Sequence, residues 1–238
     1  MHGELYPAIA GYMASKYPQE GCGLIVGGAF VPVDNVAGDP AEDFIMPPDT
    51  MLKYPDAQAV VHSHPDGPDF PSAADMAGQI ATGIPWGLCV VSADRLVSKP
   101  WYWGDSLDPP PLVGREFRHG PSGTDNKGDC YALIRDWYRL QRGVALPDFP
   151  RDDAWWETGG NLYEEHFAEA GFCEIPASQA NDSDVFLMKV MSDRTNHAGI
   201  LTSGCQLILH HLSGRLSRQE PMGMWRKFIT KWVRYKNA

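Results

Sequence analysis

The stretch of residues 104–128 constrains the fold of this chain more than any other feature of its sequence. It reads GDSLDPPPLVGREFRHGPSGTDNKG, with three consecutive prolines and five glycines. Proline lacks the amide N–H that a helix interior or a central strand requires, and glycine weakens both structures. We therefore expect two domains, over residues 1–104 and 122–238, joined by a linker over residues 105–121.

The first half of the chain alternates short buried strands with helices. Apolar and β-branched runs predict strands at residues 23–26, 59–62, 87–91 and 101–103. Helices are expected over residues 1–16 and 72–82, and the second opens with Ser72 followed three residues later by Asp75, a capping pattern. This order of elements indicates an α/β domain.

The second half has helices first and strands afterwards. Apolar periodicity predicts a helix over residues 130–143 with Cys130 in its first turn, and another over residues 161–170. Strands are expected at residues 185–191, 197–202 and 206–211. Helices followed by an antiparallel sheet indicate an α+β domain.

Charge and composition exclude several classes of protein. The net charge is −10, of which residues 1–104 carry −8, and such an acidic half repels a phosphate backbone, so we expect no nucleic-acid partner. No apolar run approaches the roughly 18 residues of a membrane span. Because the N-terminus has no basic lead followed by an apolar stretch, we expect no secretory signal. Five widely spaced cysteines without a CxxC pair predict neither a disulfide framework nor a cysteine-rich zinc site.

Two histidines and a carboxylate in the first half have the spacing of a zinc site. His62 and His64 stand at i and i+2 of an extended segment, so their imidazoles face the same side. Asp75, on the following helix, can supply a third ligand and leave the fourth position open for water, as in catalytic zinc sites. An isolated H-x-H pair is more often a surface feature, but the offsets of Ser72 and Asp75 favour a metal site. Glu20, just before an apolar strand, is the candidate base.

With these residues the first half resembles the JAB/MPN metalloprotease family, whose motif is an upstream glutamate, then H-S/T-H-P, then S-x-x-D. The resemblance covers residues 1–104 and matches every motif position. It implies a zinc cofactor and cleavage of peptide or isopeptide bonds. The roles that it implies are zinc ligands His62, His64 and Asp75, general acid/base Glu20, and Ser72 as a hydrogen-bond donor to the tetrahedral intermediate.

A cysteine and a histidine in the second half can form a nucleophile and its base. Cys130 opens a helix after a glycine-rich turn, and a helix N-terminus lowers the pKa of a thiol, so we expect a reactive thiolate there. His197 opens a strand, and His210 and His211 lie one hairpin later. Adjacent strands can place His197 beside Cys130 with a second polar group behind the imidazole. A single cysteine is more often a buried, inert residue.

The order D-C, then N-H-A-G-I, then L-H-H resembles the NlpC/P60 family of papain-like cysteine peptidases over residues 122–238. The resemblance implies Cys130 as nucleophile, His197 as base and His210 as orienter, with Asp129 a candidate to hold the free amine of the substrate. Many members continue the first motif as D-C-S-G, whereas this chain has Tyr131-Ala132 after the cysteine. The step between the histidine motifs is longer than usual, which leaves His211 as an alternative orienter.

The two domains in one chain, together with the phrases Asp129-Cys130-Tyr131 and His210-His211-Leu212, resemble a family of tail tip proteins of lambda-like siphophages. The resemblance implies synthesis in the host cytoplasm, incorporation into the virion tail tip among other tail tip proteins, and action on peptidoglycan peptide in the host periplasm or cell wall. One alternative is a structural tail tip component whose sites serve docking or are inactive. A cellular enzyme that processes ubiquitin-like tags is the least favoured, because of the fused NlpC/P60-like domain.

Overall fold

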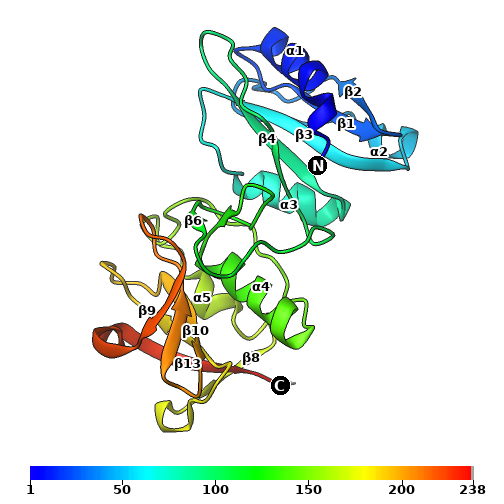
Figure 1. The fold of residues 1–238 in the computed structure, drawn as a ribbon. Helices are drawn as coiled ribbons and strands as arrows, with labels where there is room; N and C mark the ends of the chain where they lie inside the picture. Colours follow the sequence, from blue (N-terminus) through cyan, green and yellow to red (C-terminus); the bar gives the residue numbers. More distant parts are fainter. Residues whose placement is uncertain (237–238) are drawn as a thin grey trace. The chain divides into compact units, whose positions relative to one another are not determined.

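The computed structural model describes residues 1–236, which fold as two compact units. Met1–Asp108 and Gly123–Asp125 form the first unit, and Pro109–Ser122 with the described residues from Asn126 onward form the second. Figure 1 follows the chain from the first unit in blue to the second in green, yellow and red. Of the helices in this described part, none combines the length and apolarity needed to cross a bilayer.

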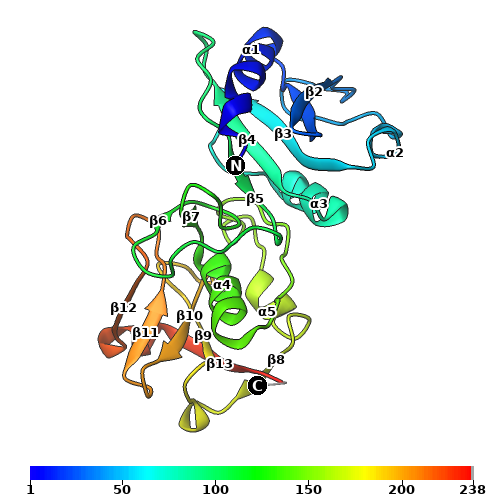
Figure 2. The same cartoon turned by 45° about the vertical axis from the view of Figure 1, so that its right-hand side comes forward.

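The first unit is built on a five-stranded mixed sheet with the order β2-β1-β3-β4-β5. Its strands are β1 (Cys22–Val26), β2 (Ala29–Val33), β3 (Ala57–Pro65), β4 (Trp86–Val91) and β5 (Trp101–Trp103). Its helices are η1 (Gly3–Leu5), α1 (Tyr6–Lys16), α2 (Thr50–Lys53) and α3 (Ala73–Thr82). β3 and β4 are parallel and joined by α3, whereas the other neighbours are antiparallel. Figure 2 shows α1 and α3 on opposite faces of this sheet.

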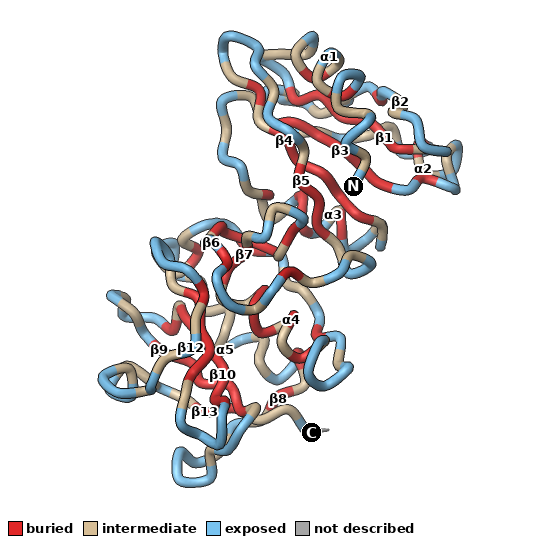
Figure 3. The backbone as a smooth tube through the Cα atoms, viewed as in Figure 1, coloured by how far each residue is buried: buried red, intermediate tan, exposed pale blue. Residues whose placement is uncertain are grey.

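Each face of the first sheet buries its own apolar cluster because successive strand residues point to opposite sides. On one face, Ala59 and Val61 of β3 pack with Ile9 of α1. On the other face, Val60 packs with Trp86. Figure 3 shows the resulting burial of the central strands in red.

The second unit contains a six-stranded antiparallel sheet with the order β12-β11-β10-β9-β13-β8. Its strands are β8 (Phe172–Ile175), β9 (Val185–Met188), β10 (His197–Thr202), β11 (Leu207–His210), β12 (Arg218–Pro221) and β13 (Ile229–Tyr235). Its helices are α4 (Cys130–Arg142), α5 (Leu162–His166), η2 (Ala177–Gln179) and η3 (Gly223–Phe228), and β6 (Glu116–Phe117) pairs with β7 (Lys127–Gly128). Ile134 and Tyr138 of α4 share a core cluster with Ile200 of β10, so the helix packs on the sheet.

The stretch that we predict as a linker is folded over most of its length. Residues 109–122 belong to the second unit and residues 123–125 to the first, so the boundary lies near residue 108. Arg115 is only 1% exposed and donates a hydrogen bond of 2.6 Å to Asp136 Oδ2. Its other nitrogens donate to two carbonyls of the proline run. A buried ion pair therefore fixes residues that composition alone assigns to a solvated connector.

Candidate active sites

The end of β3 positions the two histidines of the first site. Cβ direction alternates along a strand, so His62 and His64 share the face of Val60, and their ring centroids are 5.1 Å apart. Both are buried, at 0% and 7% exposure. The Nδ1 atom of His64 lies 2.9 Å from the carbonyl oxygen of Pro68, a contact that holds the ring and leaves Nε2 for the site.

The first turn of α3 positions the carboxylate. Ser72 is the N-cap of α3, and its Oγ accepts a hydrogen bond from the backbone nitrogen of Asp75 at 3.1 Å. In return Asp75 Oδ2 accepts hydrogen bonds from the backbone nitrogen and the hydroxyl of Ser72, both at 2.8 Å. This capping box fixes Asp75 and turns its Oδ1 toward His62 at 3.3 Å from Nε2. The Ser72 hydroxyl is engaged in the cap rather than free.

The three residues fit a zinc ion. Two ligands of a tetrahedral zinc ion, each at about 2.0 to 2.1 Å, are about 3.3 Å apart. The distance from His62 Nε2 to Asp75 Oδ1 is 3.3 Å, which matches this separation, whereas His64 Nε2 lies 3.4 Å from the other oxygen of the carboxylate. One ligand atom from each of the three residues lies within 4.8 Å of the other two. Within residues 1–236, both ring nitrogens of His62 are buried without a hydrogen-bond partner, which is costly unless a metal takes one of them. The donor set of two imidazoles and a carboxylate is one that zinc prefers.

The surroundings of Asp75 and Glu20 shift the pKa values of the two carboxyl groups in opposite directions. Although burial opposes it, the two neighbouring histidines lower the pKa of Asp75 below its usual range. Glu20, 6% exposed, has its Oε1 at 3.8 Å from His64 Nε2. Burial raises the pKa of Glu20 to about 8. Glu20 therefore lies beside the candidate ligands, within ion-pair distance of His64.

The N-terminus of α4 positions Cys130, the candidate nucleophile of the second site. Asp129 is the N-cap, and its Oδ1 accepts a hydrogen bond of 2.8 Å from the backbone nitrogen of Ala132. Its Oδ2 accepts hydrogen bonds from Gly120 at 3.1 Å and from Arg151 at 2.7 Å. Both oxygens of Asp129 are thus engaged within the chain, so a substrate amine would have to share them.

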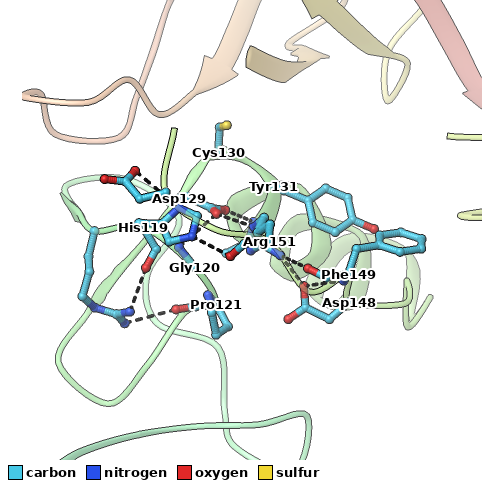
Figure 4. Close-up of polar contacts among 12 residues, drawn as sticks. His119, Gly120, Pro121, Asp129, Cys130, Tyr131, Asp148, Phe149 and Arg151 are labelled. Atoms are coloured by element: carbon cyan, nitrogen blue, oxygen red, sulfur yellow. Dashed lines mark hydrogen bonds and ion pairs between the residues drawn. The ribbon is translucent and has the colours of Figure 1, made fainter. Parts of the chain in front are cut away.

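Asp129 belongs to a buried network of alternating charges. Arg151 bridges Asp129 and Asp148, with Nη1 at 2.8 Å from Asp148 Oδ1, and Arg135 lies 3.1 Å from the other oxygen of Asp148. Figure 4 shows Arg151 between the two carboxylates, with Tyr131 alongside and Cys130 next to Asp129. Two cations thus balance two anions next to Cys130. Of these four residues, the sequence motifs predict a role only for Asp129.

A chain of hydrogen bonds runs across β10, β11 and β12. His197 Nε2 lies 3.2 Å from His210 Nδ1, and His210 Nε2 lies 2.7 Å from Glu220 Oε1. Glu220 also accepts a hydrogen bond of 3.0 Å from the indole nitrogen of Trp225. The pKa of His197 lies well below its usual range because of burial and of the nearby histidines, so the ring is neutral and able to accept a proton. The carboxylate of Glu220 was not foreseen from the sequence.

His211 faces different surroundings from His210. It is fully buried, its ring lies edge-on to Phe117 with centroids 5.3 Å apart, and within the described chain neither of its ring nitrogens has a hydrogen-bond partner. Burial lowers its pKa to about 4. The hydrogen-bond partner of His197 is thus His210, the residue that the sequence predicts as the orienter, and not the alternative His211.

Cys130 and His197 line one cavity of about 450 Å³, together with Asp129, Arg151 and Tyr163. Within residues 1–236 the side-chain hydrogen-bond partner of Cys130 Sγ is the hydroxyl of Tyr163, at 3.1 Å, and not His197. Burial, and then the charge of Asp129, raise the pKa of the Cys130 thiol to about 11. This contradicts our expectation of a resting thiolate, because burial outweighs the effect of the helix N-terminus.

Two family models match the chain. Prokaryotic homologs of the JAB domain match residues 3–104, and the NlpC/P60 family matches residues 114–234. The chain is therefore a fusion of a JAB-like domain and an NlpC/P60 domain, which confirms the fold class predicted from the sequence.

Two curated relatives align with most of the chain. Tail tip assembly protein K of Escherichia phage N15 is 34% identical over 246 residues, covering 97% of this chain and 94% of the relative. Tail tip assembly protein K of Escherichia phage lambda is 36% identical over 179 residues, covering 74% of this chain and 77% of the relative. The chain belongs to the family of tail tip assembly proteins K.

Among solved structures the chain is similar to NlpC/P60 proteins. An NLP/P60-family lipoprotein-like protein of Staphylococcus aureus has a TM-score of 0.37 and 16% identity, covering 52% of this chain and 37% of that one. The NlpC/p60 domain of the peptidoglycan hydrolase SagA has a TM-score of 0.34 and 18% identity, covering 52% of this chain and 89% of that one.

Proposed function

We propose that the chain is a phage tail tip protein whose NlpC/P60 domain cleaves the peptide of peptidoglycan during infection. The observation that carries this proposal is the shared cavity of Cys130 and His197, with His197 hydrogen-bonded to His210. Nucleophile, base and orienter are the three groups that cysteine-dependent amide cleavage requires. A peptide bound in the cavity would place its carbonyl carbon at Cys130 Sγ.

In this mechanism His197 takes the thiol proton as Sγ attacks, because the sulfur is protonated at rest and His197 is neutral. The hydrogen bond to His210 engages Nε2 of His197 and leaves Nδ1 for the thiol. Glu220 stabilises the positive charge that develops on the paired imidazoles. His197 then returns the proton to the leaving amine, and Asp129 holds the α4 turn in place while it offers a charge to the free amine of the substrate.

We further propose that the JAB domain is a zinc-dependent peptidase or isopeptidase. His62, His64 and Asp75 would hold the ion, which when bound would supply Lewis-acid activation of water and of the scissile carbonyl. Glu20 would take and return the proton of the attacking water, since a neutral or anionic carboxyl can do either near pH 8. Ser72 would keep Asp75 in place, and its donation to the tetrahedral intermediate would require the hydroxyl to leave the cap.

Membership in the family of tail tip assembly proteins K supports a proposal for where the protein acts. The chain would be made in the host cytoplasm, join other tail tip proteins in the virion, and meet peptidoglycan peptide in the periplasm or cell wall. The alternative is a structural tail tip component whose sites serve docking or are inactive. The raised pKa of the Cys130 thiol, which leaves the sulfur protonated at rest, favours that alternative.

The test of the cysteine site is mass spectrometry of muropeptides released when the purified full chain is incubated with sacculi. We expect cleaved peptides from the wild type and none from Cys130→Ala. Cys205→Ala, which changes an exposed cysteine outside the cavity, is the matched control and should behave as wild type. Equal products from Cys130→Ala would refute the cysteine mechanism.

The zinc site is tested by metal analysis of the purified protein. We expect about one zinc per chain in the wild type and in Glu20→Gln, and little in Asp75→Asn, because a neutral amide oxygen is a poor substitute for a carboxylate ligand. Hydrolysis by the JAB domain should be lost in both variants. Loss of zinc from Glu20→Gln would make Glu20 a ligand and overturn its assigned role.

A further inference from the structure

One polar group in the second site has no part in the cysteine mechanism described so far, although it touches the nucleophile. The hydroxyl of Tyr163 lies 3.1 Å from Cys130 Sγ. Tyr163 belongs to the first turn of α5, far from Cys130 in sequence, and lines the same cavity as Cys130 and His197.

The ring of Tyr163 is held in place by aromatic neighbours. It packs edge-on against Tyr131 of α4 with centroids 6.4 Å apart, and against Trp155 at 6.1 Å. These contacts set the position of the hydroxyl independently of its hydrogen bond to sulfur. The group is therefore preorganised, which is what a donor to a developing charge requires.

In the resting protein either the Cys130 thiol or the Tyr163 hydroxyl can donate this hydrogen bond, and its direction becomes fixed when the thiol loses its proton. Burial, and then the nearby Cys130 and Asp129, raise the pKa of Tyr163 well above its usual value, so the phenol keeps its proton wherever the protein is folded. Once Cys130 loses its proton, the sulfur can only accept, and the Tyr163 O–H donates to it. A neutral donor stabilises the thiolate without bringing a charge that must itself be desolvated.

We infer that Tyr163 is a further catalytic residue of the NlpC/P60 site, a neutral O–H donor first to the Cys130 thiolate and then to the oxyanion formed beside it. The inference rests on the proposed function. As Sγ bonds to the carbonyl carbon, the thiol proton passes to His197 and the carbonyl π electrons move to oxygen. Sulfur and oxyanion are then attached to one carbon, within reach of the same hydroxyl. Collapse breaks the C–N bond, and His197 protonates the amine.

The experiment compares rates of Cys130 alkylation by iodoacetamide between pH 6 and 9 in the full chain, wild type and Tyr163→Phe. Loss of a hydrogen bond to a charged group should slow alkylation by roughly tenfold or more at each pH. A purely structural role predicts the opposite, because loosening the cover over a buried sulfur speeds its alkylation. An unchanged or faster rate would overturn the inference.

Tyr138→Phe is the matched control, because this buried tyrosine of α4 donates its hydroxyl to the carbonyl oxygen of Ser183 and does not line the cavity. Its alkylation profile should equal that of the wild type. Should Tyr163→Phe fail to fold, 3-fluorotyrosine at position 163 keeps the ring and makes the hydroxyl a stronger donor. Alkylation near pH 6 should then be faster than in the wild type, and an unchanged rate would count against the inference.

Peptide cleavage provides the second readout. Removal of one oxyanion donor lowers turnover by roughly 10²-fold or more, so Tyr163→Phe should lose cleavage with little change in KM. If the wild-type chain cleaves no muropeptide, the proposed function fails, whereas the alkylation comparison still decides the role of Tyr163. If the wild type cleaves and Tyr163→Phe cleaves equally well, the function stands and the inference is wrong.

Discussion

His210 and His211 are adjacent residues with different surroundings, because successive residues of an extended chain point to opposite sides. His210 joins the hydrogen-bonded chain from His197 to Glu220. His211 packs against Phe117, and both of its ring nitrogens are buried without a hydrogen-bond partner in the described structure. Of the two, His210 is the one in contact with His197, the base of the proposed mechanism.

Replacement of each histidine in turn tests this assignment. We expect His210→Ala to lower the rate of muropeptide release by roughly 10²- to 10⁴-fold, since the base loses its fixed tautomer and orientation. His211→Leu removes a ring without hydrogen bonds and should retain most of the rate. A larger loss in His211→Leu than in His210→Ala would make His211 the orienter.

The buried His211 also predicts a pH dependence of stability. Burial lowers its pKa in the folded chain to about 4, whereas the unfolded chain has the ordinary value near 6.5. Between these values the unfolded state binds more protons, so the free energy of unfolding falls as pH falls, by on the order of 2 kcal/mol at pH 5.

Urea unfolding of the full chain at pH 7 and pH 5 measures this effect. The wild type should lose on the order of 2 kcal/mol more stability between the two pH values than His211→Leu, which has no group to protonate at this position. Equal losses in the two proteins would show that His211 is protonated in the folded state.

Spacing in the sequence was enough to group the metal-site residues, but not the partners of the cysteine site. His62, His64 and Asp75 lie within 13 positions of one another in the sequence, on a strand and the helix that follows it. Tyr163 and Glu220 reach their positions only through tertiary packing. No local sequence pattern distinguishes these two residues from the many tyrosine and glutamate side chains that lie at the solvated surface of proteins.

At the scale of elements, the pairing of β10 with β11 depends on a glycine. Gly199 is directly opposite His210, and a Cβ there would lie 2.7 Å from the carbonyl oxygen of Leu209 and 2.8 Å from His210 Cβ, as well as against the ring of Phe186. Only a residue without a side chain allows the two strands to approach at this point. The position of the orienting histidine is thereby linked to Gly199.

Gly199→Ala should therefore destabilise the protein by about 1 to 3 kcal/mol and reduce peptide cleavage, because overpacking moves His210. Gly11→Ala is the control: it lies inside α1 with nothing within 4 Å of the added Cβ, and should be neutral or slightly stabilising. Thermal unfolding and muropeptide release measure both effects. Wild-type stability and activity in Gly199→Ala would contradict this account of the strand pair.

Elements with strong patterns were predictable, and those that depend on neighbours were not. The capping box of Ser72 and Asp75 marked the start of α3, and the apolar periodicity marked α4. The helix expected over residues 161–170 is only Leu162–His166. Residues 225–236 carry five basic side chains and no acidic one, a composition that favours solvated surface. Yet β13 lies inside the sheet, where Arg234 pairs with Asp184 at 2.7 Å. The charged Lys231 and Arg234 within this strand hide its apolar pattern from an argument based on periodicity alone.

At the scale of the whole molecule, the proline- and glycine-rich stretch divides into an exposed and a buried part. Residues 105, 106 and 108 are exposed, as is Val113 at 55%, whereas Arg115 and Arg118 are buried at 1% and 4% exposure. The composition indicated a break in regular structure. It could not show which residues a buried ion pair would hold, because that depends on Asp136 in α4.

Limited proteolysis of the full chain distinguishes the two parts. Thermolysin should cut within residues 105–114 and leave two protected pieces, while trypsin should spare Arg115 and Arg118, since their backbone must unfold locally before cleavage. The ends of the fragments are read by mass spectrometry. Rapid tryptic cleavage at Arg115 would show that the whole stretch is a free linker, as the sequence predicted.

In the proposed function, Cys130 cleaves peptidoglycan peptide from within the phage tail. This claim is tested most directly by measuring the muropeptides that purified phage particles release from sacculi, with the wild-type chain or Cys130→Ala. We expect the two kinds of particle to assemble in equal numbers, and only the wild type to release peptides. Equal release from both would contradict the claim. A failure of Cys130→Ala particles to assemble would also contradict it. That result would show that the cysteine site acts in assembly of the particle instead of on the cell wall.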